Sequence, residues 1–265
     1  MIRPRRLLLL LIPLLPAGVL AEPLALQEGE SLGYRVAWGI FFHAGEIAID
    51  ARGGALEGRP CTIVSSLTST RGFLRGFLAF DAHAESFFDR ATGNMLAHAE
   101  SSDGGRKKTN TLLTLDYATA AARFTDFVDA ARSQPVALPP GEAPLDLITS
   151  LIQTRSWDLQ PGDARDINVV FERDIYQLTI HALRYETITT PLGTFRTIVY
   201  EPRMEKTPPK GMFKRGSQVH VWIARDDARR LPVKFEVEFS FGTGVATLVR
   251  HQPVAAVALN PVASP

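Results

Sequence analysis

The sequence predicts a mostly β protein: a single curled antiparallel sheet, either an open barrel or a sandwich, with one amphipathic helix near residues 144–157. Two observations carry this prediction. Many short segments alternate apolar and polar residues, as strands with one buried face do, and one segment in the middle of the chain has helical spacing instead. The composition, 45% hydrophobic and 22% charged, is that of an ordinary globular protein.

The clearest strand lies at residues 231–241. A strand places its alternating apolar residues on one face, whereas a helix would scatter them around its circumference. These residues are Leu231, Val233, Phe235, Val237, Phe239 and Phe241. Weaker alternation predicts further strands at residues 32–38, 45–50, 80–88, 176–182, 195–200, 219–223 and 245–249.

Turn-forming residues separate these segments, and short strands at such intervals are typical of a meandering antiparallel sheet. The turn signals are Gly53-Gly54, Thr92-Gly93-Asn94, Asp103-Gly104-Gly105, Pro191-Leu192-Gly193 and Gly242-Thr243-Gly244. We expect the sheet to bend and to gather its apolar side chains on the concave side.

The helix is predicted between Pro144 and Trp157. Apolar residues recur there at helical intervals, at Leu145, Ile148, Leu151 and Ile152. Proline suits the first turn of a helix, and Pro161-Gly162 would close the segment. The apolar face of this helix is expected to plug or cap the sheet.

Residues 1–21 have the pattern of a cleavable signal peptide. Three arginines precede an apolar run that Pro13 and Pro16 interrupt, and small residues lead up to Ala21. An uncleaved anchor is the alternative, but a spanning helix needs about 20 apolar residues. We therefore expect a periplasmic protein with no membrane span in the mature chain, a β-rich domain at residues 22–252 and a disordered tail at residues 253–265.

Charge and cysteine content narrow the function. Without the three arginines of the signal peptide, the chain has 26 basic and 28 acidic residues, a net charge of −2. A nucleic-acid-binding protein normally has a basic excess, so no nucleic-acid partner is expected. Cys61 is the only cysteine, lies in an apolar stretch and is expected to be a buried structural thiol.

The search for catalytic motifs finds no nucleophile elbow, no zinc-binding helix motif and no phosphate-binding glycine loop. His83 and His98 could face each other across a hairpin and recruit a metal, but two polar residues on a solvated sheet face are the favoured explanation. We expect no metal, no cofactor and no enzymatic activity.

Two segments combine basic and apolar residues. Residues 71–78 repeat the same four residues, Arg-Gly-Phe-Leu, twice. This segment would touch a lipid surface or line the mouth of an apolar cavity, or else pack its phenylalanines onto the sheet. Residues 201–216 have a net charge of +3 and would form either a basic lid over an anionic ligand or a solvated hairpin loop. The apolar candidates for contacting a ligand are Phe73, Leu74, Phe77, Leu78, Met212, Phe213 and Trp222.

Three groups of residues form an ordered pattern along the chain. They are Gly29-Glu30, Tyr34 and Ala44-Gly45, then Asp146, Ser150, Arg155 and Gly162, then Val221-Trp222, Asp226, Arg230 and Leu231-Pro232-Val233. Together they resemble the motifs of the DUF3108 family of exported bacterial proteins, over about residues 27–250. The resemblance implies a periplasmic, mostly β protein with no assigned activity, and it carries over no catalytic residue.

Five of the matched positions are expected to be structural: Gly45, Asp146, Arg155, Asp226 and Pro232. Asp146 and Arg155 would anchor the helix through ion pairs. Trp222 and Pro232 would mark a hairpin, because proline lacks an N–H and suits the start or the edge of a strand.

These features favour a non-enzymatic protein that binds a lipid, another apolar ligand or an outer-envelope component in the curled sheet. The alternative is an envelope scaffold that pairs an exposed strand edge with a protein partner. An enzyme acting on envelope glycans or lipids is the third hypothesis, and no sequence motif supports it.

Overall fold

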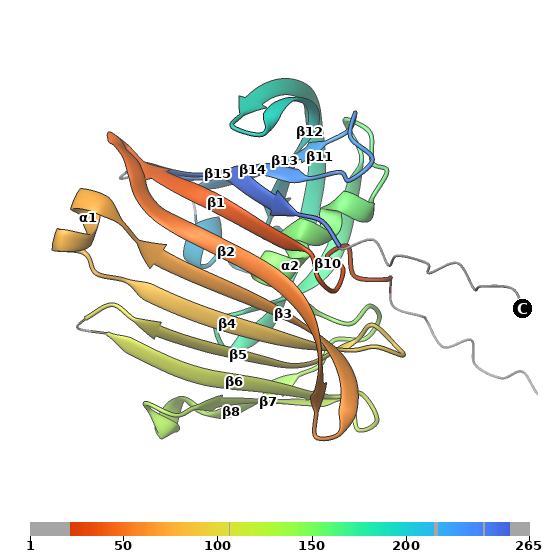
Figure 1. Cartoon of the computed structure of the whole chain (residues 1–265). Helices are drawn as coiled ribbons and strands as arrows, with labels where there is room; N and C mark the ends of the chain where they lie inside the picture. Colours follow the sequence, from red (N-terminus) through yellow and green to blue (C-terminus); the bar gives the residue numbers. More distant parts are fainter. Residues whose placement is uncertain (1–21, 106, 215–216, 241, 255–265) are drawn as a thin grey trace, which may run out of the picture.

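A computed structural model of the chain describes residues 22–105, 107–214, 217–240 and 242–254. The expected signal peptide, Phe241 and residues 255–265 of the expected tail lie outside these ranges. The described chain forms one strongly curled sheet of 15 strands (Figure 1). This confirms the predicted mostly β class and the single curled sheet, which does not close into a barrel.

The described part of the chain contains two α-helices and three short 3₁₀ helices among its strands. In order, the elements are β1 (Ser31–Trp38), β2 (Phe41–Leu56), β3 (Arg59–Thr70), α1 (Gly72–Phe77), β4 (Asp81–Asp89), β5 (Met95–Asp103), β6 (Lys108–Asp116), β7 (Ala121–Asp126), η1 (Ala130–Arg132), β8 (Gln134–Ala137), β9 (Leu145–Asp146), α2 (Leu147–Gln153), η2 (Thr154–Ser156), β10 (Ala164–Phe171), β11 (Asp174–Thr190), β12 (Gly193–Arg203), η3 (Gly211–Phe213), β13 (Gln218–Ala224), β14 (Pro232–Phe239) and β15 (Gly242–Gln252).

The first and last strands meet in the middle of the sheet. Its order is β8-β7-β6-β5-β4-β3-β2-β1-β15-β14-β13-β12-β11-β10-β9, and every pair is antiparallel except β9 with β10. The two edge strands have only four and two residues, and β8 also contains Pro135. The curl brings β8 into contact with β11. The side-chain amide of Gln134 in β8 donates to the carbonyl of Arg173, which directly precedes β11, at 3.2 Å. Only short edges therefore remain for pairing with a partner strand.

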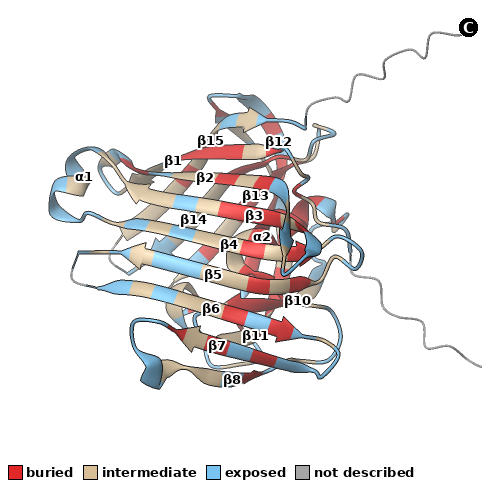
Figure 2. Ribbon diagram, turned by 60° about the horizontal axis from the view of Figure 1, so that its bottom comes forward, coloured by how far each residue is buried: buried red, intermediate tan, exposed pale blue. Residues whose placement is uncertain are grey.

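The hydrophobic core fills one end of the curl. The largest fully buried side chains include Tyr34, Phe88, Met95 and Ile152. Figure 2 shows the buried residues concentrated toward the ends of β3 to β7 that lie away from α1. Because α2 lies inside the curl, with Leu151 and Ile152 buried, it plugs this end of the sheet as expected (Figure 1).

The mid-chain helix is shorter than the sequence predicts. Pro144 lies outside it, Leu145 and Asp146 pair in parallel with β10, and α2 begins at Leu147. The Asp146 side chain accepts a hydrogen bond from the Thr149 N–H and so caps the helix at this point. After Gln153 the chain tightens into η2, which ends at Ser156.

Gly45 lies where β2 and β3 approach each other closely. A Cβ at this position would lie 2.7 Å from the carbonyl oxygen of Ser69. We therefore expect Gly45→Ala to lower the free energy of unfolding by about 1–3 kcal/mol, the usual range for overpacking. Gly76→Ala is the matched control, since nothing lies within 4 Å of its added Cβ. Urea unfolding of both variants checks this, and equal stabilities would contradict it.

Candidate functional site

The strands run up and down, so their connections alternate between the two ends of the sheet. One end carries α1 and the connections at residues 39–40, 71–80, 104–105 with 107, 127–133, 172–173, 204–214 with 217, and 240. We call this the α1 end, which lies at the left in Figure 1. The opposite end, which holds most of the core, is called the far end.

A cavity of about 470 Å³ lies inside the curl toward the α1 end. One wall comes from the inner face of β3 to β7, and the other from β9, α2, β10 and η3. The residues lining it are Ser66, Thr68, Ala82, Ala84, His98, Glu100, Lys107, Thr109, Thr111, Phe124, Arg132, Asp146, Leu147, Ile148, Val170, Phe171, Glu172 and Met212. This volume is within the range of small-molecule binding sites.

The two walls of the cavity differ in chemistry. On β3 to β6 the wall consists mainly of small or polar side chains, such as Thr68, His98 and Glu100. On the other side, Ile148, Phe171 and Met212 are apolar. The expectation of an apolar concave face is therefore correct for the filled end of the curl and wrong for this wall, where the inward positions of four strands carry polar groups.

A hydrogen-bond network joins the polar wall to α2. The Asp146 carboxylate accepts from the Ser86 hydroxyl at 2.7 Å and from the Thr149 hydroxyl. His98 Nδ1 lies 2.8 Å from the same Ser86 oxygen. Because the single Ser86 proton points to Asp146, His98 donates from Nδ1 to the Ser86 oxygen.

This arrangement differs from a catalytic triad. In a triad the histidine lies between the serine and the carboxylate and takes the proton of the serine. Here Ser86 lies in the middle, is buried and donates directly to Asp146. No sequence motif marked Ser86, because its partners are 12 and 60 residues away along the chain.

His83 does not join His98. In the ladder between β4 and β5, His83 pairs with Ser101 and His98 pairs with Ser86. Three positions separate His83 from Ser86, and side chains alternate between the faces of a strand, so the two histidines lie on opposite faces of the sheet. Within the described ranges, no group of three or more His, Cys, Asp or Glu side chains is arranged to hold a metal.

Charged side chains line the cavity at its α1 end. Arg132 forms an ion pair with Asp126 at 3.2 Å. The backbone N–H groups of Asp129 and Val128, together with this guanidinium, lower the pKa of Asp126. Lys107 also lines the cavity and has no ion pair with any described residue.

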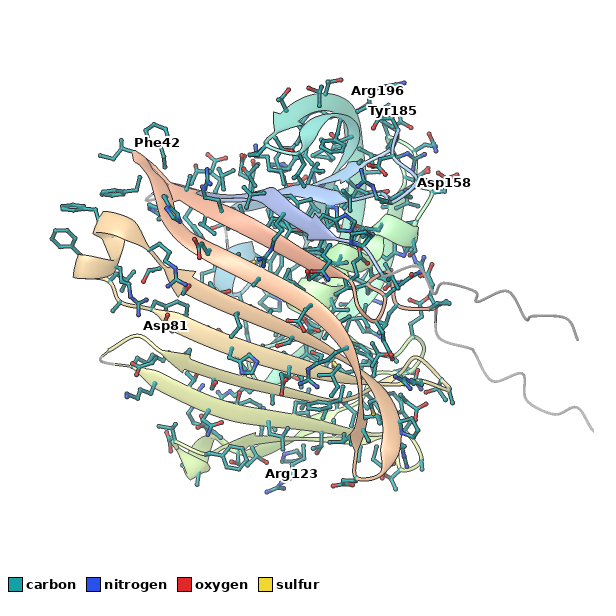
Figure 3. All side chains as sticks on the ribbon, in the orientation of Figure 1. Phe42, Asp81, Arg123, Asp158, Tyr185 and Arg196 are labelled. Atoms are coloured by element: carbon teal, nitrogen blue, oxygen red, sulfur yellow. The ribbon has the colours of Figure 1, made fainter. Side chains whose placement is uncertain are left out.

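The side chains of the segment at residues 71–78 are mostly exposed. Phe73, Phe77 and Leu78 are exposed and Leu74 is half-buried, while the Phe73 ring also stacks against that of Phe41 in β2. The expectation that the phenylalanines pack onto the sheet therefore holds only for this one contact of Phe73. None of these four residues lines the cavity. The base of the segment is held by the Arg75 guanidinium, which forms two hydrogen bonds to the Asp81 carboxylate and lowers its pKa (Figure 3).

Two basic residues of the segment at residues 201–216 form ion pairs with carboxylates, and a third donates to a tyrosine hydroxyl. Arg203 pairs with Glu201, Lys206 pairs with Asp166, and the Lys210 ammonium donates to the Tyr176 hydroxyl at 2.6 Å. Met212 lines the cavity. Phe213 is buried and packs edge-to-face against Phe171, with ring centroids 6.1 Å apart.

The closing motif lies away from the cavity. Trp222 is buried on β13 beneath the Lys234 ammonium, which lies 4.0 Å from the ring centroid. Asp226 accepts a hydrogen bond from the Arg196 N–H at 3.1 Å, between the hairpin and β12. Pro232 is the first residue of β14, and its carbonyl accepts from the buried Tyr34 hydroxyl at 2.9 Å.

The two charged residues of the helix motif have different roles. Arg155 forms a buried ion pair with Glu30 at 3.0 Å and donates to the carbonyl of Arg229 at 2.7 Å. His251 from the last strand lies 3.0 Å from the same Glu30 carboxylate. Asp146, by contrast, has no ion pair with any described residue and acts through its hydrogen bonds, so the expected Asp146 ion pair is wrong.

In the described part of the chain, no helix has the length and apolar character that crossing a membrane requires. No curated protein matches the sequence of the chain. Among solved structures, a β-barrel-like protein of the DUF1849 domain from Brucella abortus is similar, with a TM-score of 0.55 and 6% identity over 84% of this chain and 96% of that one. At this identity the similarity concerns the fold alone.

Two further solved structures are similar at lower TM-scores. A candidate lipoprotein from Parabacteroides distasonis has a TM-score of 0.31 and 10% identity, over 87% of this chain and 97% of that one. A candidate exported protein with a YmcC-like fold from Bacteroides fragilis has a TM-score of 0.27 and 12% identity, over 86% and 97%. A family model described as a protein of unknown function, DUF3108, matches residues 33–249. Since this match covers most of the chain, the protein belongs to the DUF3108 family.

Proposed function

We propose that the protein is a non-enzymatic periplasmic binding protein that holds a lipid or another ligand with an apolar chain in the cavity of its curled sheet. The export pattern of residues 1–21 supports the location. The main support for the proposal is the chemistry of the cavity, in which one wall is apolar and the other offers hydrogen-bonding groups.

Such a cavity suits a ligand with an apolar body and a polar end. Ile148, Phe171 and Met212 would contact the apolar part. His98 Nε2 and the Thr109 and Thr111 hydroxyls would face its polar part. The proposal is non-enzymatic because Ser86, Asp146 and His98 are engaged in holding α2 to the sheet rather than in activating a nucleophile.

The proposal predicts that purified mature protein takes up an acyl chain. Titration with a dansyl-labelled fatty acid should give saturable fluorescence, and native mass spectrometry should show the one-to-one complex. Ala84→Trp should weaken binding by about tenfold or more, because an indole ring at this lining position occupies the space of the ligand.

Ala91→Trp is the matched control, since Ala91 lies in the exposed turn between β4 and β5. It should bind the fatty acid as the wild type does. Circular dichroism of both variants shows that the fold is retained. Equal affinity of the two tryptophan variants, or no uptake by the wild type, would contradict the proposal.

A further inference from the structure

Exposed apolar side chains are concentrated at the α1 end. Of the eleven exposed large apolar side chains in the described part of the chain, seven lie there: Ile40, Phe42, Phe73, Phe77, Leu78, Phe127 and Val128. Six of them come from three separate connections of the sheet, and Phe42 is the second residue of β2. In Figure 3, Phe42 projects from this end, while Tyr185 lies toward the other side of the molecule.

Five of the seven lie on or beside two adjoining segments, the β1–β2 hairpin and the β3–β4 connection, and we call them the apolar tip: Ile40, Phe42, Phe73, Phe77 and Leu78. Phe42 is 85% exposed and Phe77 is 75% exposed. The tip is nevertheless well anchored. The Phe73 ring lies 6.0 Å from that of Phe41 and 4.8 Å from that of Phe77, and the Arg71 N–H donates to the carbonyl of Ala44 at 2.8 Å.

Basic side chains accompany the apolar ones. The described connections of the α1 end carry eight basic and three acidic residues, whereas those of the far end carry five and six. Four of the eight form ion pairs with carboxylates on the strands: Arg71, Arg75, Arg132 and Lys206. Of the other four, Lys107, Arg173 and Lys214 have no ion pair with any described residue and are available to an anionic partner, whereas Lys210 donates to the Tyr176 hydroxyl.

From this distribution we infer that the α1 end docks onto the surface of a lipid bilayer that contains anionic headgroups. Aromatic and apolar side chains beside lysine and arginine are the pattern of interfacial membrane binding. The exposed apolar and basic side chains come mostly from separate connections of the sheet. A flat, extended surface such as a bilayer can contact all of them at once. Two copies meeting through this end would bring their unpaired cations together, which disfavours self-association.

Docking by this end would place the cavity next to the membrane. Lys107, Arg132 and Glu172 line the cavity and belong to connections of the α1 end. The inference stands on the apolar tip and the unpaired cations, so it does not require the proposed ligand binding to be correct.

The test is co-sedimentation of the mature protein with vesicles. We expect binding to vesicles of equal parts phosphatidylglycerol and phosphatidylcholine, and weaker binding to phosphatidylcholine alone or in high salt. Phe42→Ser combined with Phe77→Ser should lower the partition coefficient by about tenfold or more, since inserting a phenyl ring contributes at least this factor. Both side chains are exposed, so the fold should be retained.

Leu192→Ser combined with Val254→Ser is the matched control, because both residues are exposed and lie outside the α1 end. It should bind vesicles as the wild type does, and so should Ala84→Trp, which separates docking from ligand uptake. The inference fails if the wild type does not bind anionic vesicles or if both serine pairs bind equally. It also fails if the tip variant only turns a dimer into a monomer.

Discussion

Replacing Arg155 by methionine is expected to lower the free energy of unfolding by about 3–5 kcal/mol. The Arg155 guanidinium contacts both oxygens of the Glu30 carboxylate, at 3.2 and 3.0 Å, and both side chains are more than nine-tenths buried. Without Arg155 the Glu30 carboxylate stays buried with His251 and the Gln27 N–H as hydrogen-bond partners, and the carbonyl of Arg229 loses a charged donor. An uncompensated buried charge explains the size of the effect.

Urea unfolding followed by tryptophan fluorescence measures this change. Arg184→Met is the matched control, because Arg184 pairs with Glu186 at the surface, where an ion pair contributes about 1 kcal/mol or less. Adding Glu30→Gln to Arg155→Met should restore part of the lost stability, since it removes the unpaired charge. The expected loss in the free energy of unfolding is about 3–5 kcal/mol. If Arg155→Met alone lowers it by less than about 1 kcal/mol, the ion pair with Glu30 is not needed for stability.

The second large effect is expected for Asp146→Ala, which should lower the free energy of unfolding by about 2–4 kcal/mol. Part of this is the lost helix cap, about 1 kcal/mol. The larger part comes from the Ser86 and Thr149 hydroxyls, which lose their acceptor while buried, and an unsatisfied buried donor costs about 1–3 kcal/mol. Because Ser86 is also the acceptor of His98, the variant should loosen the contact between α2 and the polar wall of the cavity.

Asp129→Ala provides the comparison. Asp129 caps η1 in the same way, by accepting from the Ala131 N–H, but at the surface. Asp129→Ala should lower the free energy of unfolding by about 1 kcal/mol or less, since the N–H groups that lose their acceptor can form hydrogen bonds with water. Hydrogen exchange of the α2 amides adds a local measurement: faster exchange in Asp146→Ala and unchanged exchange in Asp129→Ala are expected. The reverse order would contradict the role given to Asp146.

The strands that the alternation pattern predicts are those whose inner face is apolar. Residues 32–38, 195–200 and 219–223 fall within β1, β12 and β13, and the predicted strand at residues 231–241 contains β14. Strands β3, β5 to β8 and β10 were not predicted. In β10 neighbouring residues such as Val169 and Val170 are both buried, so the strand shows no alternation. On β5 the inward positions are held by His98 and Glu100, so no apolar alternation marks the strand. The polar residues at these inward positions form the polar wall of the cavity, and they also remove the apolar alternation by which the strand could have been predicted.

The candidate site was predictable only in part. Residues 71–78 and Met212 were selected because apolar residues beside basic ones are unusual in a soluble loop, and such a signal is local. The partners of Arg155 could not be found in this way, because Glu30 lies 125 residues before it and His251 lies 221 residues after Glu30. The cap formed by Asp146 was mistaken for an ion pair, since a carboxylate at a helix start fits either role.

The sequence by itself determined the mostly β class, the run of short antiparallel strands, the single mid-chain helix and the membership of the DUF3108 family. Alternation and turn residues suffice for this, because each depends on neighbours within a few positions. Only the tertiary structure decided that Ser86, His98 and Asp146 meet, that the cavity has one polar wall and that the exposed phenylalanines share one end. These features depend on strand register and on the curl of the sheet, which bring together residues from distant segments and are not encoded in any local pattern.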